Sequence, residues 1–136
     1  MDSFLLTMRE FLKKRGINAS EEKPDSMKFS VNTLNFLCET TDKDPFFLRL
    51  SLPRINNDDA QIDRLSEDVQ MLNRTYKVVK IVRGADGYLW IIADLFIYST
   101  DNIELMFDRI IQAMTEMIND YRKLEKEKGY GTVQSS

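Results

Sequence analysis

The chain has 136 residues, of which 43% are hydrophobic and 30% charged, and it carries a net charge of −3. This composition is typical of one globular domain and excludes wholesale disorder, while the mildly acidic balance argues against nucleic acid or an anionic membrane as a partner. One cysteine excludes an internal disulfide. Because the N-terminus lacks a signal-peptide pattern and no apolar run has membrane-spanning length, we expect a cytoplasmic protein.

The first half of the chain predicts one helix followed by an antiparallel meander. Ser3 can cap a helix over residues 3–15 whose apolar side chains share one face, and Gly16 can end it. Residues 18–25 are polar and contain a proline, which predicts a loop. Segments that alternate apolar and polar residues then predict three strands, over residues 27–31, 34–39 and 46–52.

The second half predicts a helix, a hairpin and a longer helix. A second helix, capped by Asn57 or Asp58, carries a narrow apolar stripe that ends at Leu72. A turn with two glycines then joins two strands, which are predicted over residues 78–83 and 88–98. Residues 101–126 have the strongest helical amphipathicity of the chain, so this helix should lie on the sheet.

The predicted order is therefore α-β-β-β-α-β-β-α, which indicates an α+β fold with a five-stranded antiparallel sheet and flanking helices. We find no internal repeat and no linker. The sequence thus predicts a single domain over residues 1–128, followed by a flexible tail over residues 129–136.

The long second strand of the hairpin is apolar on both of its faces. Trp90, Ile92 and Phe96 point one way, whereas Leu89 and Ile91 point the other way. An antiparallel strand with one face in water normally alternates apolar and polar residues. The helices of the chain can cover one face, so we expect a second subunit or a bound partner to cover the other.

This pattern predicts a protein that binds other proteins and does not catalyse a reaction. We expect a homodimer that pairs these sheet faces, with a segment of a partner protein held nearby. The alternative is a monomer in which the last helix covers one sheet face and the first helix covers the other. The candidate interface residues are Leu37, Phe47, Met71, Trp90, Ile92, Phe96 and Tyr98.

The sequence contains no recognisable catalytic, metal or cofactor motif. Histidine, the commonest metal ligand and general base, is absent, and the glycines form no phosphate-binding loop. We therefore predict no catalytic residue, no metal site and no cofactor. The acids of the second helix are spread around its circumference and predict a solvated face; they are Asp58, Asp59, Asp63, Glu67 and Asp68.

Two further residues have both a functional and a structural interpretation. Cys38 lies on the apolar side of its strand without a histidine to activate it, which favours a small buried hydrophobe over a nucleophile. Asp94 shares a face with Trp90, and its functional interpretation is an acid with a raised pKa or an anchor for a basic group of a partner. Pairing of Asp94 with a neighbouring cation is the favoured interpretation, and the candidates are Lys80, Arg83 and Arg49.

Two other function classes stay open. The first is a small-molecule-binding regulator, with a pocket between sheet and helices lined by Trp90, Phe96 and the methionines Met106, Met114 and Met117. The second is an enzyme that uses carboxylates alone, around Asp94. Co-purified small molecules would favour the first class, and loss of a measured turnover on Asp94→Asn would be required for the second.

The element order and three stretches resemble a known family. They are FSVNTLNF at residues 29–36, LRLSLP at residues 48–53, and LNRTYKVVK at residues 72–80. Over about residues 2–126 the chain is similar to the bacterial YbjN-like family, described as candidate sensory transduction regulators, with a type III secretion chaperone-like fold. Secretion chaperones of this fold are small, acidic homodimers that hold an extended segment of a secreted protein. The resemblance therefore implies a non-enzymatic protein-binding role.

Overall fold

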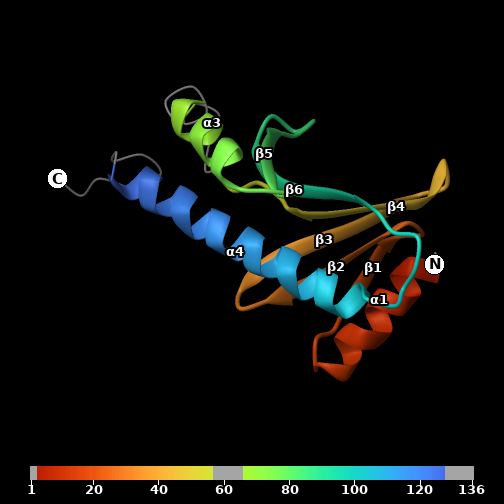
Figure 1. Ribbon diagram of the computed structural model, residues 1–136. Helices are drawn as coiled ribbons and strands as arrows, with labels where there is room; N and C mark the ends of the chain where they lie inside the picture. Colours follow the sequence, from red (N-terminus) through yellow and green to blue (C-terminus); the bar gives the residue numbers. More distant parts are fainter. Residues whose placement is uncertain (1–2, 57–65, 128–136) are drawn as a thin grey trace.

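The computed structural model describes residues 3–56 and 66–127, which form a six-stranded antiparallel sheet and helices that pack against it. The described elements are α1 (Ser3–Lys14), β1 (Ser20–Lys23), β2 (Ser26–Val31), β3 (Leu34–Thr41), β4 (Asp44–Leu52), α3 (Ser66–Thr75), β5 (Lys80–Arg83), β6 (Leu89–Phe96) and α4 (Ile103–Glu127). Across the sheet the strand order is β1-β2-β3-β4-β6-β5 (Figure 1). The predicted α+β class with an antiparallel sheet is confirmed.

The predicted number of strands was wrong, because the segment expected to be a loop contains β1. All four residues of β1 are exposed, so the strand has no apolar alternation that could reveal it. Its backbone nevertheless pairs with β2, with Glu21 opposite Met27. The observed order of the described elements is therefore α-β-β-β-β-α-β-β-α.

The boundaries of the second predicted helix can be compared only in part. The described helix α3 runs to Thr75, three residues beyond the predicted end of the apolar stripe at Leu72. The predicted caps Asn57 and Asp58 lie outside the described residues, as does the predicted tail over residues 129–136.

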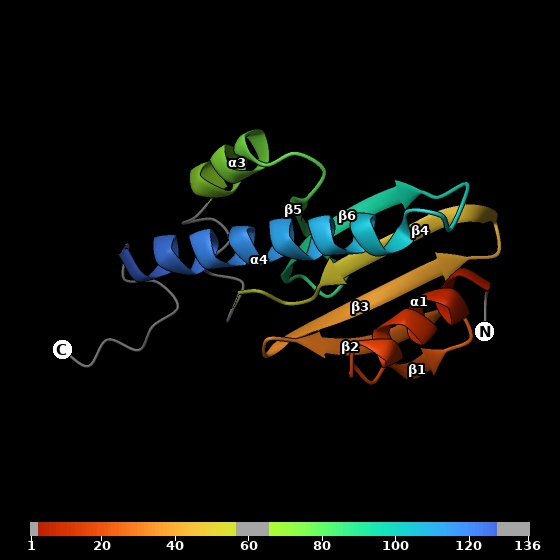
Figure 2. The ribbon, with the colours of Figure 1, turned by 60° about the horizontal axis from the view of Figure 1, so that its bottom comes forward.

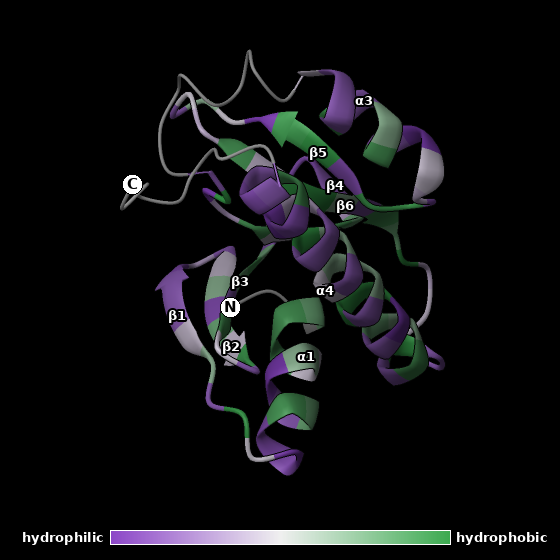
Figure 3. Ribbon diagram, turned by 90° about the vertical axis from the view of Figure 1, so that its left-hand side faces the viewer, coloured by the Kyte–Doolittle hydropathy of each residue, from purple (hydrophilic) through white to green (hydrophobic). Residues whose placement is uncertain are grey.

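The hydrophobic core lies between one face of the sheet and the two helices α1 and α4 (Figures 2 and 3). The ring of Phe107 in α4 lies 5.0 Å from that of Phe11 in α1 and 5.6 Å from that of Phe29 in β2. Arg15, just after α1, forms an ion pair with Asp108 of α4. Both helices therefore cover the same face, and α1 does not wrap the other face as the monomeric alternative required.

Helix α3 packs beside α4 at the outer edge of β5. The side-chain amide of Asn73 accepts a hydrogen bond from the backbone N–H of Ile81 at 2.7 Å and donates one to its carbonyl at 3.0 Å. The ammonium of Lys80 donates to the carbonyls of Asn73 and Tyr76 at the end of α3, at 2.6 and 2.5 Å. A cation at the C-terminal end of a helix satisfies carbonyls that have no partner within the helix.

A strained γ-turn connects α3 to β5. Val78 has a φ of 72°, and the N–H of Val79 donates to the carbonyl of Lys77 at 2.8 Å. A γ-turn with positive φ is rare, and a β-branched residue is especially unfavourable there. This turn also explains why β5 begins at Lys80 rather than at residue 78, where the apolar pattern predicted it.

Replacing Val78 by glycine should stabilise the protein by about 1 kcal/mol, because glycine has no Cβ and adopts positive φ without a steric clash. The Val78 side chain is 57% exposed, so little packing is lost. Urea unfolding of both proteins measures the change. The control is Val82→Gly in the extended strand β5, which should destabilise the protein. A Val78→Gly protein that is less stable than the parent would contradict the assignment of strain to this turn.

Candidate partner-binding face

The face of the sheet opposite α1 and α4, here called the open face, is not covered by any of the described helices. In β6 the residues Leu89, Ile91 and Ala93 are buried under the helices, as predicted. Trp90 and Ile92 point to the open face and are only half-buried. The prediction that the chain covers only one side of its longest apolar strand is thus confirmed for the described residues.

Side chains on the open face form rows that run across the strands. Residues opposite each other in neighbouring antiparallel strands have Cβ atoms about 5 Å apart, so each row is continuous. The register defines four rows: Phe47 with Phe96; Glu39 with Arg49 and Asp94; Leu37 with Ser51, Ile92 and Lys80; and Val82 with Trp90.

One end of the open face is aromatic. Phe96 is 65% exposed beside Phe47, and Tyr98, just beyond β6, is 74% exposed. The ring of Tyr98 packs at 4.9 Å against that of Phe46, which is itself exposed. We call these four residues the aromatic end. Phe47 and Phe96 belong to the open face, whereas Phe46 alternates with Phe47 along β4, so Phe46 and Tyr98 lie at the tip of the sheet beside it. Exposed apolar side chains that lie together often mark interaction sites.

A charged row separates the aromatic end from the rest of the open face. Arg49 donates to both carboxylate oxygens of Asp94, at 2.6 and 2.9 Å, and these hydrogen bonds raise the pKa of Arg49 above its ordinary value. The predicted pairing of Asp94 with a neighbouring cation is confirmed. Glu39 occupies the same row on the other side of Arg49, and its negative charge also raises the pKa of Arg49.

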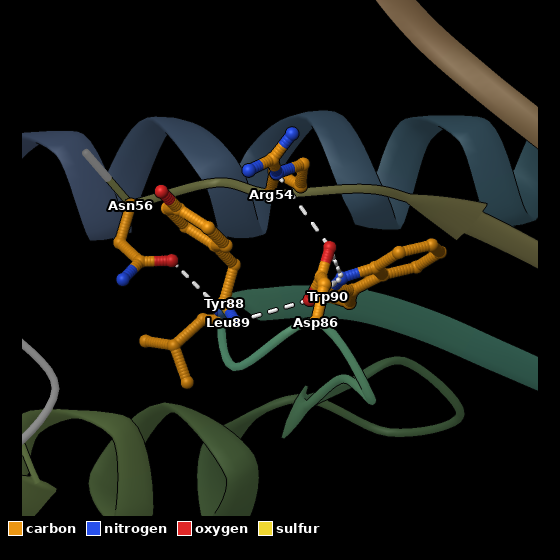
Figure 4. A network of polar contacts seen from close by, with 6 residues as sticks. All are labelled: Arg54, Asn56, Asp86, Tyr88, Leu89 and Trp90. Carbon is orange, nitrogen blue, oxygen red and sulfur yellow. Dashed lines mark hydrogen bonds and ion pairs between the residues drawn. The ribbon is translucent and has the colours of Figure 1, made fainter. Parts of the chain in front are cut away.

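Beyond the charged row, the indole of Trp90 is held across the β5–β6 turn (Figure 4). Its N–H donates to the two carboxylate oxygens of Asp86, at 3.0 and 3.2 Å. Gly84 makes this position possible, because a Cβ there would lie 2.5 Å from the indole nitrogen. The ring is thus fixed both by a hydrogen bond and by a close approach that only glycine permits.

Asp86 is the centre of this polar network. Burial alone would raise the pKa of Asp86, but hydrogen bonds from the Tyr88 backbone and the Trp90 indole, with the charge of Arg54, lower it below its ordinary value. The guanidinium of Arg54 lies 3.6 Å from Asp86 and 4.1 Å above the ring of Tyr88. Next to this network, the side-chain amide oxygen of Asn56 accepts a hydrogen bond from the backbone N–H of Leu89 at 2.7 Å. The wall formed by Trp90 is therefore preorganised.

A hollow of about 580 Å³ opens next to this wall. Residues of β3, β4, β5, β6 and the β5–β6 turn line it. They are Glu39, Arg49, Val82, Arg83, Gly84, Ala85, Asp86, Trp90 and Ile92. We call it the Trp90 hollow.

The structure brings most of the predicted interface residues together. Leu37, Phe47, Trp90, Ile92 and Phe96 lie on the open face. Tyr98 lies just beyond β6 and packs against Phe46 at the tip of the sheet. Met71 does not belong to this group, because it lies on α3 at the β5 edge, where it is exposed.

Sequence reasoning missed the residues that build the Trp90 hollow around its indole. Glu39 was not singled out, and Arg83 was named only as a possible partner of Asp94, since which residues meet at the hollow depends on the strand register. The glycine-containing turn was recognised, but not the role of Gly84 in making room for the indole.

The other predicted candidates have structural roles. Cys38 is fully buried, and burial raises the pKa of its thiol to about 12, which confirms its interpretation as a small hydrophobe.

Within residues 3–56 and 66–127, no three acidic or cysteine side chains converge in a way that could hold a metal ion. None of the described helices combines the length and apolarity that a bilayer-spanning segment needs.

Comparison with known proteins identifies the fold. No protein-family model and no curated protein matches the sequence. The structure is similar to the crystal structure of YbjN from E. coli, described as "a putative transcription regulator", with a TM-score of 0.65 and 13% sequence identity. The match covers 89% of this chain and 93% of that one. The resemblance found in the sequence is thereby confirmed at the level of structure, and the chain has a YbjN-like fold.

Proposed function

We propose that this chain is a non-enzymatic protein-binding module, chaperone-like or regulatory, that works in the cytoplasm. It dimerises through the aromatic end of the open face and holds a segment of a partner protein in the Trp90 hollow. The observation that carries the proposal is the contrast between the two sheet faces. One is sealed by α1 and α4, whereas the other presents half-buried and exposed aromatic side chains.

The composition and shape of the aromatic end support a contact between two copies. Aromatic residues are enriched at the centres of protein interfaces and dominate their energetics. In a two-fold dimer the same patch meets itself, so Phe96 and Tyr98 of one copy would be covered by the same residues of the other. The Arg49–Asp94 pair lies at the inner border of this patch, where a polar rim is expected.

Phe96→Asp should convert the dimer into a monomer, because a carboxylate would be buried without a partner at the centre of the contact. Size-exclusion chromatography with light scattering measures the mass. The control is Leu105→Asp in α4, since Leu105 is exposed to the same 65% but lies away from the open face; this variant should stay dimeric. A wild-type protein that is monomeric at high micromolar concentration would rule out the dimer.

A second candidate function is the binding of a small regulatory molecule. The pocket predicted between sheet and helices is not formed, since Met114 and Met117 are fully buried in the core and Trp90 and Phe96 point away from them. The volume of the Trp90 hollow, however, lies within the range of about 300–1,000 Å³ that is common for ligand sites. Native mass spectrometry of the purified protein would detect a retained ligand.

A further inference from the structure

We propose that two copies of the chain stack their open faces about a two-fold axis that runs between β4 and β6, parallel to these strands. This inference rests on the proposed function and specifies how the two copies meet. It assigns the contact to the aromatic end and the charged row. The two sheets need not approach each other at Trp90, which lies two rows further along β6.

The register of β4 and β6 decides which residues meet in such a dimer. A two-fold axis midway between two neighbouring strands brings β4 of one copy opposite β6 of the other. Residues that are paired side by side within one sheet then face each other between the two sheets. Phe47 would therefore face Phe96 of the second copy, and Arg49 would face Asp94 of the second copy.

The charged row is self-complementary about this axis. Within one copy, Arg49 donates to Asp94 through its Nε and one Nη, at 2.6 and 2.9 Å. Because a guanidinium has five N–H donors, further donors remain for a second carboxylate. In the dimer each Arg49 would lie between two Asp94 carboxylates, one from each copy, so the four charges would alternate in sign. This alternation offsets the cost of removing the charges from water.

The third charge of the row does not disturb this arrangement. Glu39 lies on β3, which the axis places opposite β5 of the second copy. Strand β5 begins at Lys80, which belongs to the neighbouring row with Ile92. No strand residue of the second copy therefore places a like charge opposite Glu39.

The aromatic end is complementary about the same axis. Phe96 is 65% exposed, and Phe47 beside it is half-buried. Packed sheets lie about 10 Å apart, a distance that side chains from both sheets fill together. Aromatic rings favour offset or edge-on contacts, which Phe47 of one copy and Phe96 of the other could form on both sides of the axis. The dimer would thus cover the most exposed ring of the open face.

Other two-fold axes in the plane of the contact match the open face less well. An axis along the charged row, or one centred on β4, would set Arg49 against Arg49 of the second copy, and facing like charges oppose association. An axis between β3 and β4 would pair Glu39 with Arg49. It would, however, place Phe96 opposite β2 of the second copy, away from the aromatic end. Only the axis between β4 and β6 satisfies both rows.

Two single charge reversals test this axis. In Arg49→Asp and in Asp94→Arg, each dimer would contain two facing pairs of like charges, so its dissociation constant should rise about a hundredfold. An equimolar mixture of the two variants should form a heterodimer, because every reversed charge then faces an opposite charge. Size-exclusion chromatography with light scattering measures both effects. Single variants that dimerise like the wild type, or a mixture that stays monomeric, would overturn the inference.

The double variant Arg49→Asp/Asp94→Arg tests the same axis without breaking the pair inside each copy. It should form homodimers, but it should not exchange subunits with the wild type, because that heterodimer would bring like charges together. Native mass spectrometry with isotope-labelled wild type detects the exchange. A statistical mixture of homodimers and heterodimers contradicts the inference. Both side chains are 40% exposed, so the reversals do not bury an isolated charge, and circular dichroism verifies each fold.

The inference and the proposed function fail in different ways. If the wild type is a dimer that Phe96→Asp dissociates but that exchanges freely with the double variant, the axis is wrong and the dimeric binding module stands. If the wild type is monomeric at high micromolar concentration, the proposed dimer itself is wrong.

Discussion

Gly84→Val should destabilise the protein by about 2 kcal/mol and shift the emission of Trp90 towards longer wavelength. A Cβ at position 84 would lie 2.5 Å from the indole nitrogen and 2.7 Å from the adjacent ring carbon. The indole is too bulky to yield by a small rotation, so it must leave its site and lose both hydrogen bonds to Asp86. Overpacking of this kind typically costs about 1–3 kcal/mol.

Urea unfolding gives the change in stability, and steady-state fluorescence reports the environment of the displaced ring. Ala85→Val is the matched control, because it adds bulk to the neighbouring, exposed residue of the same turn. That variant should change neither quantity appreciably. If Gly84→Val kept the parental emission maximum and stability, the indole would not be held by the turn as described.

Glu125→Gln should raise the free energy of unfolding by about 1–3 kcal/mol at pH 8. The wild type must bury a charged and unpaired carboxylate when it folds at this pH, whereas the variant buries a neutral amide, and this range is the usual cost of an unpaired buried polar group. Glu125 lies in α4 with its Oε2 buried and without a hydrogen-bond partner among the described residues. Burial raises the pKa of Glu125 above its ordinary 4.5, although Tyr121 and the charge of Arg122 oppose that rise.

The direction of the pH dependence follows from this raised pKa. Below about pH 4.5 the carboxyl is protonated in both the folded and the unfolded chain, so it has no effect. As the pH rises towards the folded-state pKa, the unfolded chain releases the proton first, and wild-type stability falls. The difference in the free energy of unfolding between Glu125→Gln and the wild type should therefore grow as the pH rises through this range and then become constant. Thermal unfolding between pH 4 and pH 8 measures it.

Glu127→Gln provides the control for this series, since it makes the same change of charge at an exposed position of the same helix. Its stability should follow that of the wild type at every pH. A constant difference between Glu125→Gln and wild type, independent of pH, would show that Glu125 is not the titrating group.

The burial of individual strand residues could be predicted because it depends on local alternation. The assignment of Trp90, Ile92 and Phe96 to one face of β6 needed only the period of two that every strand has. The same pattern placed Leu37 and Phe47 on that face of their strands. Strand β1 was not predicted because all of its residues are exposed. Its side chains therefore show no alternation of apolar and polar residues, although its backbone pairs with a neighbouring strand.

The Trp90 hollow could not be predicted, because it depends on the register of strands that are distant in sequence. Glu39 and Arg49 come near the indole only through the pairing of β3 with β4 and of β4 with β6. The position of Met71 was missed for a similar reason. The helical pattern showed that it lay off the apolar stripe, but not that α3 docks at the β5 edge.

The amide of Asn73 has a consequence for how this sheet avoids uncontrolled growth. It offers Ile81 the same donor and acceptor that an incoming strand would offer, so the β5 edge is closed to foreign chains. The opposite border, β1, is not covered by any of the described residues, but the like charges of its Glu21 and Glu22 would repel the same strand of another molecule. We therefore expect each border of the sheet to oppose edge-to-edge pairing in its own way: side-chain hydrogen bonds occupy the backbone of β5, and like charges repel at β1.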